Sequence, residues 1–360
     1  MKKNLYIFSD SSIRRKDKTL LIERICKEES EIDEFEREEK DFLEEYLLGK
    51  DILLPSGDKK YIPVESIDSI FSIGAVYFNS RFMYFLSQHQ IPMHVFNYFG
   101  GYAGSFLPAS DINSGTILIQ QVKHHKHPVK RLEIAKQFVF GALSNAIANL
   151  KYYNNRGSHV DDHIEQIEDI REYIESATSV EELMGLEGAA KKVYYSAWRY
   201  IFVYPVDFTR RVKNPPDNLI NALISYGNMI VYSVCLNEIY HSRLYPEIGF
   251  LHQPGENRHS LAFDVAEIFK PIITDRVIFK MINKHIITES DAIQKNRKCF
   301  LKKKAKQEFV AALEDKLMTK IQVDGRDTRR SYRRLIREEC FKVVDHLKES
   351  DKYIPFISKW

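Results

Sequence analysis

The chain has 360 residues, of which 44% are hydrophobic and 29% charged, and this composition excludes a largely disordered protein. The formal net charge of +3 is too small to identify a partner, so only the local distribution of charge is informative. Two domains are expected at this length, because one domain usually has about 100 to 200 residues. The four cysteines form no CxxC pair and are expected to be reduced and buried.

Residues 1–108 predict a small β-rich domain. Short runs rich in Ile, Val, Tyr and Phe alternate there with Gly, Pro, Asp and Ser, which is typical of strands and turns. Strands are expected within 4–10, 19–23, 51–67, 72–78 and 91–99. The acidic segment 28–49 interrupts these runs, and its apolar residues recur at helical spacing, which predicts an inserted amphipathic helix.

Residues 109–360 predict a larger all-α domain, so the fold class is segregated α+β. From about residue 115 the apolar residues recur at steps of three and four. Helices are expected within 132–153, 163–177, 181–201, 214–240 and 261–269. The fourth is apolar on almost every face, as a central buried helix is, and Asp217 is expected to cap it.

No membrane span is predicted. The N-terminal apolar run is too short for a signal sequence, and polar residues interrupt the longest apolar stretch, around 219–236. A cytoplasmic location is therefore expected.

Two basic runs are candidates for phosphate contact. Residues 294–306 carry seven basic and no acidic side chains, and 325–337 carry six arginines and one aspartate. Solvated helix faces and phosphate-binding surfaces both explain such runs. His124, His125 and His127 lack the spacing of a zinc motif, so surface or phosphate contact is favoured for them.

The helix expected at 261–269 contains two acids in an apolar sequence. Asp264 and Glu267 are three residues apart, so they lie on one face about a helical turn apart, and Ser260 is a plausible N-cap. Asp264 could simply complement the helix dipole. A buried carboxylate, however, needs a cation, which Lys270 or Arg276 could supply.

A divalent metal is the other way to balance these acids. His252, in a loop shortly before the helix, could supply an imidazole ligand. Glu187 is a further candidate, because Gly185, Gly188 and two alanines surround it and allow close approach of a backbone or ligand. The alternative for Glu187 is an ordinary acid at a helix start.

Four segments together carry a resemblance to a known family. They are "GLEGAA" at 185–190, "RRVKNPPDNLINALISYG" at 210–227, "IGFLHQ" at 248–253 and "SLAFDVAEIFKPIITDRVI" at 260–278. In this order and spacing, the chain resembles the CRISPR-associated endonuclease and integrase family Cas1, the catalytic subunit of spacer acquisition. Similar segments near both termini extend the resemblance over almost the whole chain.

The resemblance implies that Glu187, His252 and Asp264 coordinate Mg²⁺ or Mn²⁺, with Glu267 as an accessory catalytic group. It implies a metal-dependent DNA endonuclease and integrase that inserts spacer DNA into the CRISPR array by phosphodiester transesterification. It also implies a homodimer formed through the β-rich domain and assembly with the small subunit Cas2. A catalytically silent DNA-binding assembly subunit of the same fold is the alternative.

DNA at such a site would be held through its backbone by basic side chains, which position it without reading sequence. The basic residues expected to contact DNA are Lys191, Arg210, Arg211, Lys213, Arg258, Lys270 and Arg276.

Overall fold

The computed structural model describes residues 2–25, 59–97, 101–108, 114–213, 215–255, 259–323 and 329–359. The chain divides into two compact units, Met1–Ser110 and Asp111–Trp360, where the sequence predicted domains 1–108 and 109–360. The acidic helix predicted at 28–49 lies outside the described residues.

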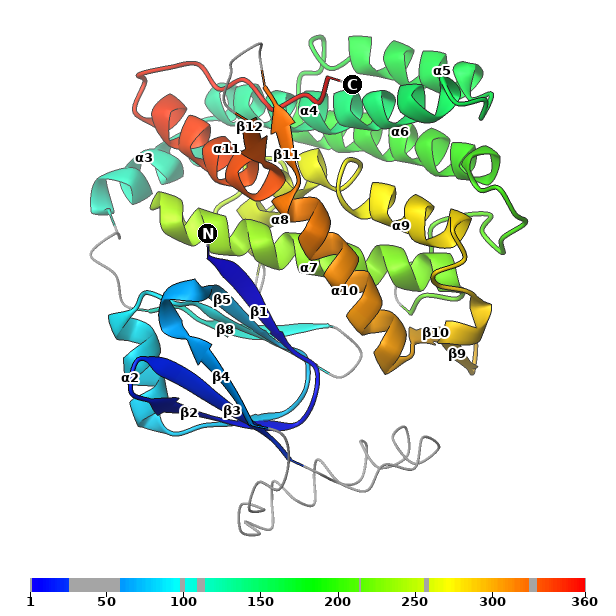
Figure 1. Ribbon diagram of the computed structural model, residues 1–360. Coiled ribbons are helices and arrows are strands. Elements are labelled where there is room, and N and C mark those ends of the chain that lie inside the picture. Colours follow the sequence, from blue (N-terminus) through cyan, green and yellow to red (C-terminus); the bar gives the residue numbers. More distant parts are fainter. Residues whose placement is uncertain are drawn as a thin grey trace. The chain divides into compact units, whose positions relative to one another are not determined.

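The first unit is rich in β-structure, as predicted (Figure 1). Its strands are β1 (Lys3–Ile7), β2 (Ser11–Lys16), β3 (Thr19–Arg24), β4 (Lys59–Pro63), β5 (Ile67–Ser72), β6 (Val76–Tyr77), β7 (Met93–Phe96) and β8 (Tyr102–Phe106). They form two four-stranded sheets with the orders β1-β5-β7-β8 and β4-β3-β2-β6. Asp17 has φ of 54° in the β2–β3 turn, a left-handed conformation that aspartate tolerates.

One hydrophobic core joins the two sheets to the helix α2 (Ser80–Gln88). Ile13 and Leu20 enter it from one sheet, Ile70 and Met93 from the other, and Phe82 from α2. Neither β2 nor α2 was expected from the sequence. β2 is buried only in its first half, and α2 is short, with one cap in which the Asn79 side chain accepts a hydrogen bond from the Phe82 amide.

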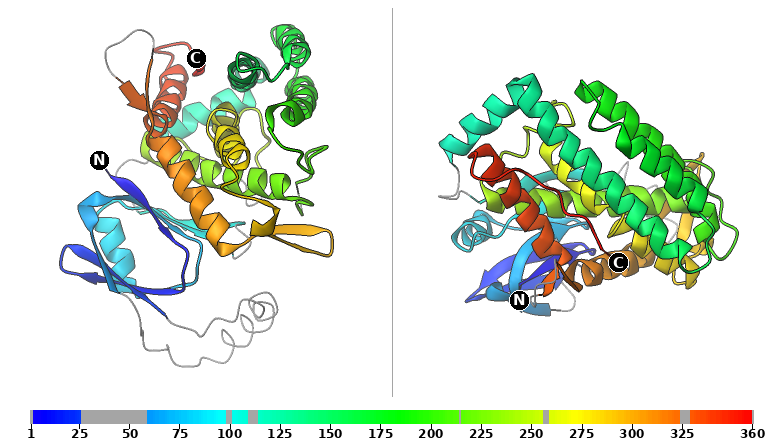
Figure 2. Two further views of the ribbon diagram at one scale, coloured as in Figure 1. Left: turned by 45° about the vertical axis from the view of Figure 1, so that its right-hand side comes forward. Right: turned by 90° about the horizontal axis from the view of Figure 1, so that it is seen from above.

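The second unit is mainly helical, as predicted. Its helices are α3 (Gly115–Lys126), α4 (Pro128–Asn154), α5 (Asp161–Glu172), α6 (Val180–Ile201), α7 (Leu219–Ser242), α8 (Ser260–Phe269), α9 (Thr274–Asn283), α10 (Lys303–Met318) and α11 (Tyr332–Leu347). Figures 1 and 2 show α4, α5 and α6 side by side, and each contacts the other two. The helix α8 packs against both α4 and α7, which places its acids in the interior of this unit.

The helix α7 is the central buried helix that its apolar sequence predicts. It is long and apolar enough to cross a membrane, but 83% of its most apolar window is buried inside the unit, as expected of a core helix. The predicted Asp217 cap is wrong by one residue. The Asn218 side chain caps α7 by accepting from the Asn221 amide, and Asp217 accepts from the Asn221 side chain instead.

Two short hairpins depart from the predicted all-α domain. β9 (Ala292–Lys295) pairs with β10 (Lys298–Leu301), and β11 (Lys320–Gln322) pairs with β12 (Arg329–Ser331). Asn296 and Arg297 join the first pair with φ of 50° and 61°, and positive φ at both central residues is typical of the tight turns that close hairpins. Part of the first basic run is therefore a hairpin rather than a helix face.

The cysteines follow the prediction where the structure describes them. Cys235, Cys299 and Cys340 are free and buried. Cys26 lies outside the described residues.

Candidate active site

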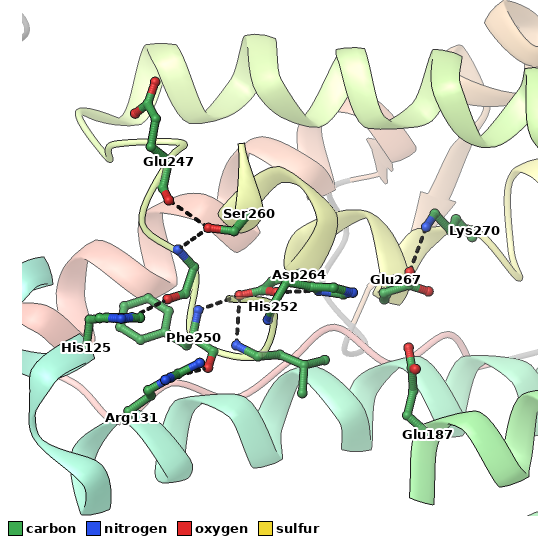
Figure 3. Close-up of polar contacts among 12 residues, drawn as sticks. His125, Arg131, Glu187, Glu247, Phe250, His252, Ser260, Asp264, Glu267 and Lys270 are labelled. Atoms are coloured by element: carbon green, nitrogen blue, oxygen red, sulfur yellow. Dashed lines mark hydrogen bonds and ion pairs between the residues drawn. The ribbon is translucent and has the colours of Figure 1, made fainter. Parts of the chain in front are cut away.

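The Asp264 carboxylate lies at the centre of the loop that precedes α8, with no exposed surface (Figure 3). Its Oδ2 accepts from the backbone amides of Phe250 at 2.6 Å and Leu251 at 3.0 Å. Its Oδ1 accepts from the His252 amide at 2.9 Å and from the His252 Nδ1 at 2.8 Å. Two carboxylate oxygens offer about four lone-pair directions, and these four donors use all of them. Asp264 therefore folds the 249–252 loop around itself.

Neither the predicted N-cap role of Ser260 nor the predicted dipole role of Asp264 describes the start of α8. His259, rather than Ser260, is the N-cap of α8, and its side chain makes no capping hydrogen bond. The Ser260 hydroxyl donates to the Glu247 carbonyl at 2.7 Å and accepts from the Gly249 amide at 2.7 Å. Ser260 thus fastens the loop to the helix, next to Asp264.

Gly249 is required by close packing. A Cβ on this residue would lie 2.8 Å from the Asp264 Oδ2 and 2.8 Å from the Ser260 carbonyl carbon. We expect Gly249→Ala to lower the free energy of unfolding by about 2 kcal/mol, since backbone and a buried carboxylate cannot yield. The measurement is urea denaturation followed by circular dichroism.

Gly185→Ala is the matched control for this substitution. A Cβ at Gly185 meets no described atom within 4 Å, and the residue lies inside α6. This variant should gain about 0.5–1 kcal/mol, because alanine favours a helix over glycine. Equal stability of Gly249→Ala and the wild type would contradict the packing argument.

Side chains of α3 and α4, distant in sequence, hold the same loop from outside. Gln121 is fully buried, and its amide donates to the Tyr245 and Ile248 carbonyls at 2.8 and 2.7 Å. The His125 Nδ1 donates to the Gly249 carbonyl at 2.7 Å, and the Arg131 Nε donates to the Phe250 carbonyl at 2.8 Å. Burial lowers the pKa of His125, although its hydrogen bond to the Gly249 carbonyl raises it.

These three residues were missed by the sequence interpretation. Of the histidine group, His125 was assigned to surface or phosphate contact, but it supports the loop. His124 is also buried, with its Nδ1 2.9 Å from the Gln120 carbonyl. The sequence carries no signal of these contacts, because the loop that the side chains bind lies more than 100 residues further along the chain.

The two remaining acids face each other across α6 and α8. Glu187 lies within α6 rather than at its start, and Figure 3 shows it pointing toward Glu267 of α8. The Lys191 ammonium lies between them, 2.5 Å from the Glu187 Oε1 and 2.7 Å from the Glu267 Oε2. The Lys270 ammonium lies 2.7 Å from the Glu267 Oε1. The two carboxylates thus already share a cation.

The ion pairs fix the protonation states of this group. Burial alone would raise the pKa of Glu267, but the Lys191 and Lys270 charges bring it well below its usual range. Burial alone would lower the pKa of Lys191, but Glu267 and Glu187 raise it instead. Glu267 is therefore a carboxylate and Lys191 an ammonium at neutral pH.

His252 directs its second ring nitrogen toward these carboxylates. Because Nδ1 donates to Asp264, Nε2 is the nitrogen left for a ligand, and such a hydrogen bond is typical of histidines that bind metals. Burial lowers the pKa of His252, but the Asp264 hydrogen bond and the charges of Asp264, Glu267 and Glu187 raise it overall. In Figure 3 the ring lies between Asp264 and Glu267.

The donor set suits a divalent cation that prefers oxygen and imidazole ligands, as Mg²⁺ and Mn²⁺ do. The Lys191 ammonium bound between Glu187 and Glu267 acts as a stand-in for such a cation. No three His, Cys, Asp or Glu side chains in the described part of the chain are gathered closely enough to form a ready-made metal cluster. A metal would therefore require Lys191 to move.

The predicted DNA-contact residues fall into different environments. Lys191 and Lys270 are part of the acidic site itself. Lys213 is largely exposed. Partial burial and the charges of Lys191 and Arg211 lower its pKa, while the Glu267 charge raises it, so Lys213 lies close to the acidic site. Arg210 is exposed. Arg258 lies outside the described residues.

Two of the predicted arginines are engaged within the protein. The Arg211 guanidinium donates to the Asn221 side chain at 3.1 Å and to the Ser225 hydroxyl at 2.9 Å, so it fastens the Lys213 segment to α7. The Arg276 guanidinium stacks on the Tyr152 ring, 3.5 Å from its centroid.

The second basic run is largely neutralised within the protein. Arg330 and Arg334 both pair with Glu338, Arg333 pairs with Glu314 and Arg337 pairs with Glu238. Four of its six arginines therefore have structural partners, which favours the structural explanation over phosphate contact for this run.

Comparison with known proteins gives the family. Residues 5–315 match the family model for CRISPR associated protein Cas1. The chain belongs to the Cas1 family. The CRISPR-associated endonuclease Cas1 of Fusobacterium nucleatum is 38% identical over 360 residues, which cover 100% of this chain and 98% of that protein. A Cas1 endonuclease of Thermodesulfovibrio yellowstonii is 38% identical over 365 residues, covering 100% of both chains.

Solved structures share the fold. A Cas1 protein from Thermotoga maritima has a TM-score of 0.79 at 31% identity, covering 99% of this chain and all of that chain. A casposase bound to its integration product has a TM-score of 0.80 at 18% identity, covering 99% and 93%. The second likeness concerns the fold alone. The predicted segregated α+β fold of a Cas1 protein is confirmed.

Proposed function

We propose that this chain is the metal-dependent DNA endonuclease and integrase of CRISPR adaptation, which inserts spacer DNA into the array by transesterification. The observation that carries the proposal is the cation held between Glu187 and Glu267, beside the His252 imidazole. Names of full-length relatives support an endonuclease, and the fold shared with a casposase bound to an integration product is consistent with DNA integration.

Glu187, His252 and Glu267 are proposed to hold the Mg²⁺ or Mn²⁺ ion. Asp264, which the resemblance assigned as a ligand, is proposed instead to position the His252 loop, because its oxygens already accept four hydrogen bonds. Glu267 takes the ligand role in its place. When bound, the ion supplies Lewis-acid stabilisation of the charge that develops on a phosphodiester.

The chain's own residues would orient the DNA. Lys213 and Arg210 are exposed on the segment that Arg211 fastens to α7, so they are suited to bind phosphate oxygens beside the acids. A DNA 3′-hydroxyl then attacks the phosphorus of the held phosphodiester, and the bond from that phosphorus to its own 3′-oxygen breaks. This oxygen leaves as a 3′-hydroxyl, taking up a proton in place of the one that the attacking hydroxyl gives up, and no covalent protein intermediate forms. Contact with phosphates alone would make binding salt-dependent and independent of base sequence.

Partners and location are part of the same proposal. A structure of a Cas6-RT-Cas1–Cas2 complex has a TM-score of 0.76 at 17% identity, over 100% of this chain and 36% of that chain. We propose Cas2 as a partner, a homodimer formed through the β-rich unit, and a cytoplasmic location. The size exclusion profile of the chain with and without purified Cas2 tests the first two.

A catalytically silent DNA-binding subunit is the second candidate. A protein that only binds DNA has no need of a loop built around Asp264 to aim the His252 Nε2 at two carboxylates. This arrangement favours the enzyme.

The deciding test is integration and disintegration of a branched DNA with Mn²⁺ or with EDTA. Glu187→Gln, His252→Ala and Glu267→Gln should each lower the rate by about 10³-fold or more, because each removes a proposed ligand. Lys192→Gln, an exposed neighbour of the site, is the control and should retain the wild-type rate. Turnover in EDTA, or full activity of all three variants, would reject the proposed function.

A further inference from the structure

The Lys191 ammonium occupies the space that a metal bound to both acids would need. It lies within 2.7 Å of an oxygen of each, and electrostatic repulsion prevents an ammonium and a divalent cation from sharing so small a volume. Lys191 is one turn after Glu187 on α6, and about a third of its side chain is exposed, so the ammonium can move while the helix stays in place.

A cavity borders the Lys191 side chain. This cavity of about 40 Å³ is lined by Lys191, Tyr194, Glu267, Lys270 and Asp275, together with apolar residues of α4 and α5. This volume exceeds the space that one water molecule needs, and an ammonium group is of similar size. A short rotation of the lysine side chain would therefore bring its charge into the cavity.

Asp275 offers an oxygen for the ammonium in that cavity. The residue is only 3% exposed. Its Oδ2 accepts a hydrogen bond from the Tyr194 hydroxyl at 2.9 Å, and that hydroxyl accepts from the Asn149 amide at 2.8 Å. Its Oδ1 is buried and accepts no hydrogen bond from the residues that the structure describes. A buried acceptor without a donor is costly, so a cation that reaches it is strongly favoured.

We infer that Lys191 is a two-position counter-ion, paired with Glu187 and Glu267 in the metal-free protein and with Asp275 once a metal has entered. This inference rests on the proposed function, because it takes Glu187 and Glu267 to be metal ligands. The lysine keeps the empty site neutral and folded. Asp275 then favours metal binding from outside the ligand set, by stabilising the displaced ammonium.

Metal binding without DNA tests this directly. Purified full-length protein, stripped with EDTA and dialysed, is titrated with MnCl₂, and free Mn²⁺ is measured by electron paramagnetic resonance. Lys191→Met should bind Mn²⁺ roughly tenfold more tightly, since no internal cation has to be displaced. Lys191→Gln, whose amide can still donate to the acids, should change in the same direction. Lys192→Met removes an adjacent exposed charge and should match the wild type.

A double-mutant cycle isolates the second position. Asp275→Asn should weaken Mn²⁺ binding roughly tenfold when Lys191 is present and leave it unchanged in the Lys191→Met background. Thermal unfolding in EDTA confirms that each variant is folded.

Three results would overturn the inference. Unchanged or weaker binding by both Lys191 variants, or an Asp275→Asn effect of equal size in both backgrounds, would reject the lysine movement and leave the proposed function standing. Failure of the wild type to bind Mn²⁺ at millimolar concentration would reject the proposed metal site, and the inference with it.

Discussion

Replacing Asp264 with asparagine should lower the free energy of unfolding by about 3 kcal/mol. The carboxylate accepts hydrogen bonds from buried backbone amides of residues 250–252, and the NH₂ group of asparagine would place donors against these donors. The loop would lose the carboxylate around which it folds, and His252 would lose the hydrogen bond that fixes its ring. Urea denaturation with EDTA present measures this, since no metal contributes there.

Glu267→Gln is the matched variant, because it makes the same chemical change one helical turn away. Its oxygens contact lysines at 2.7 Å rather than backbone amides, and Lys191 keeps Glu187 as a partner. The amide oxygen that replaces the carboxylate can still accept from Lys270, but the largely buried ion pairs are lost, so we expect a smaller loss of stability than for Asp264→Asn, about 1–2 kcal/mol, while Mn²⁺ binding and integration are lost. If Asp264→Asn loses mainly stability and Glu267→Gln loses mainly Mn²⁺ binding, then Asp264 holds the loop and Glu267 binds the metal.

The opposite pattern would restore the role that the resemblance gave to Asp264. If Asp264→Asn unfolds like the wild type in EDTA but no longer binds Mn²⁺, its carboxylate is a metal ligand. If Glu267→Gln binds Mn²⁺ normally, Glu267 is only accessory. Each result can be obtained without DNA, so neither depends on the integration assay.

The sequence and the family resemblance named residues that the structure brings close together, but not the contacts that each of them makes. The i, i+3 spacing put Asp264 and Glu267 on one face of a helix, and the structure has them there. Spacing cannot show that three backbone amides converge on one acid and two lysines on the other. That distinction depends on how the 249–252 loop folds back onto α8.

The supporting residues could not be predicted, for a related reason. Gln121, His125 and Arg131 bind carbonyl groups of a loop more than 100 residues away in sequence, and carbonyl groups leave no signature in a sequence. The second basic run, residues 325–337, contains one contact that a sequence reveals and one that it does not. The Arg334–Glu338 pair has the i, i+4 spacing that a sequence reveals, whereas the Arg337–Glu238 pair joins α11 to α7 and requires the fold.

The overall architecture was more accessible, because it rests on periodicity. The change from short alternating runs to three- and four-residue spacing separated the β-rich part from the helical part, and the apolar α7 sequence indicated a buried helix. The β9–β10 hairpin was missed because most of it lies within the basic run 294–306 and its turn has no glycine. Its turn depends on positive φ at Asn296 and Arg297, which asparagine tolerates well but which is not typical of arginine.

Asp275→Asn should remove a pH dependence of stability that reaches about 4 kcal/mol. Burial raises the pKa of Asp275 to about 7, from the 3.8 of an unfolded chain, and the Glu267 charge raises it further. The Tyr194 hydrogen bond and the Lys270 charge act in the opposite direction. Three pKa units correspond to roughly 4 kcal/mol. Since the folded state binds the proton more tightly, Asp275 contributes full stability below pH 3.8 and loses it as the pH rises to about 7.

The measurement is the free energy of unfolding from urea denaturation at several pH values between 4.5 and 8, in EDTA. The difference between Asp275→Asn and the wild type should grow in favour of the variant as the pH rises, and level off above pH 7, where the wild type must hold an ionised carboxylate. Asparagine keeps an acceptor for the Tyr194 hydroxyl, so the polar contact survives. A difference that is constant across this range would mean that Asp275 is already ionised in the folded protein, held by Lys191 or Lys270 even without a metal.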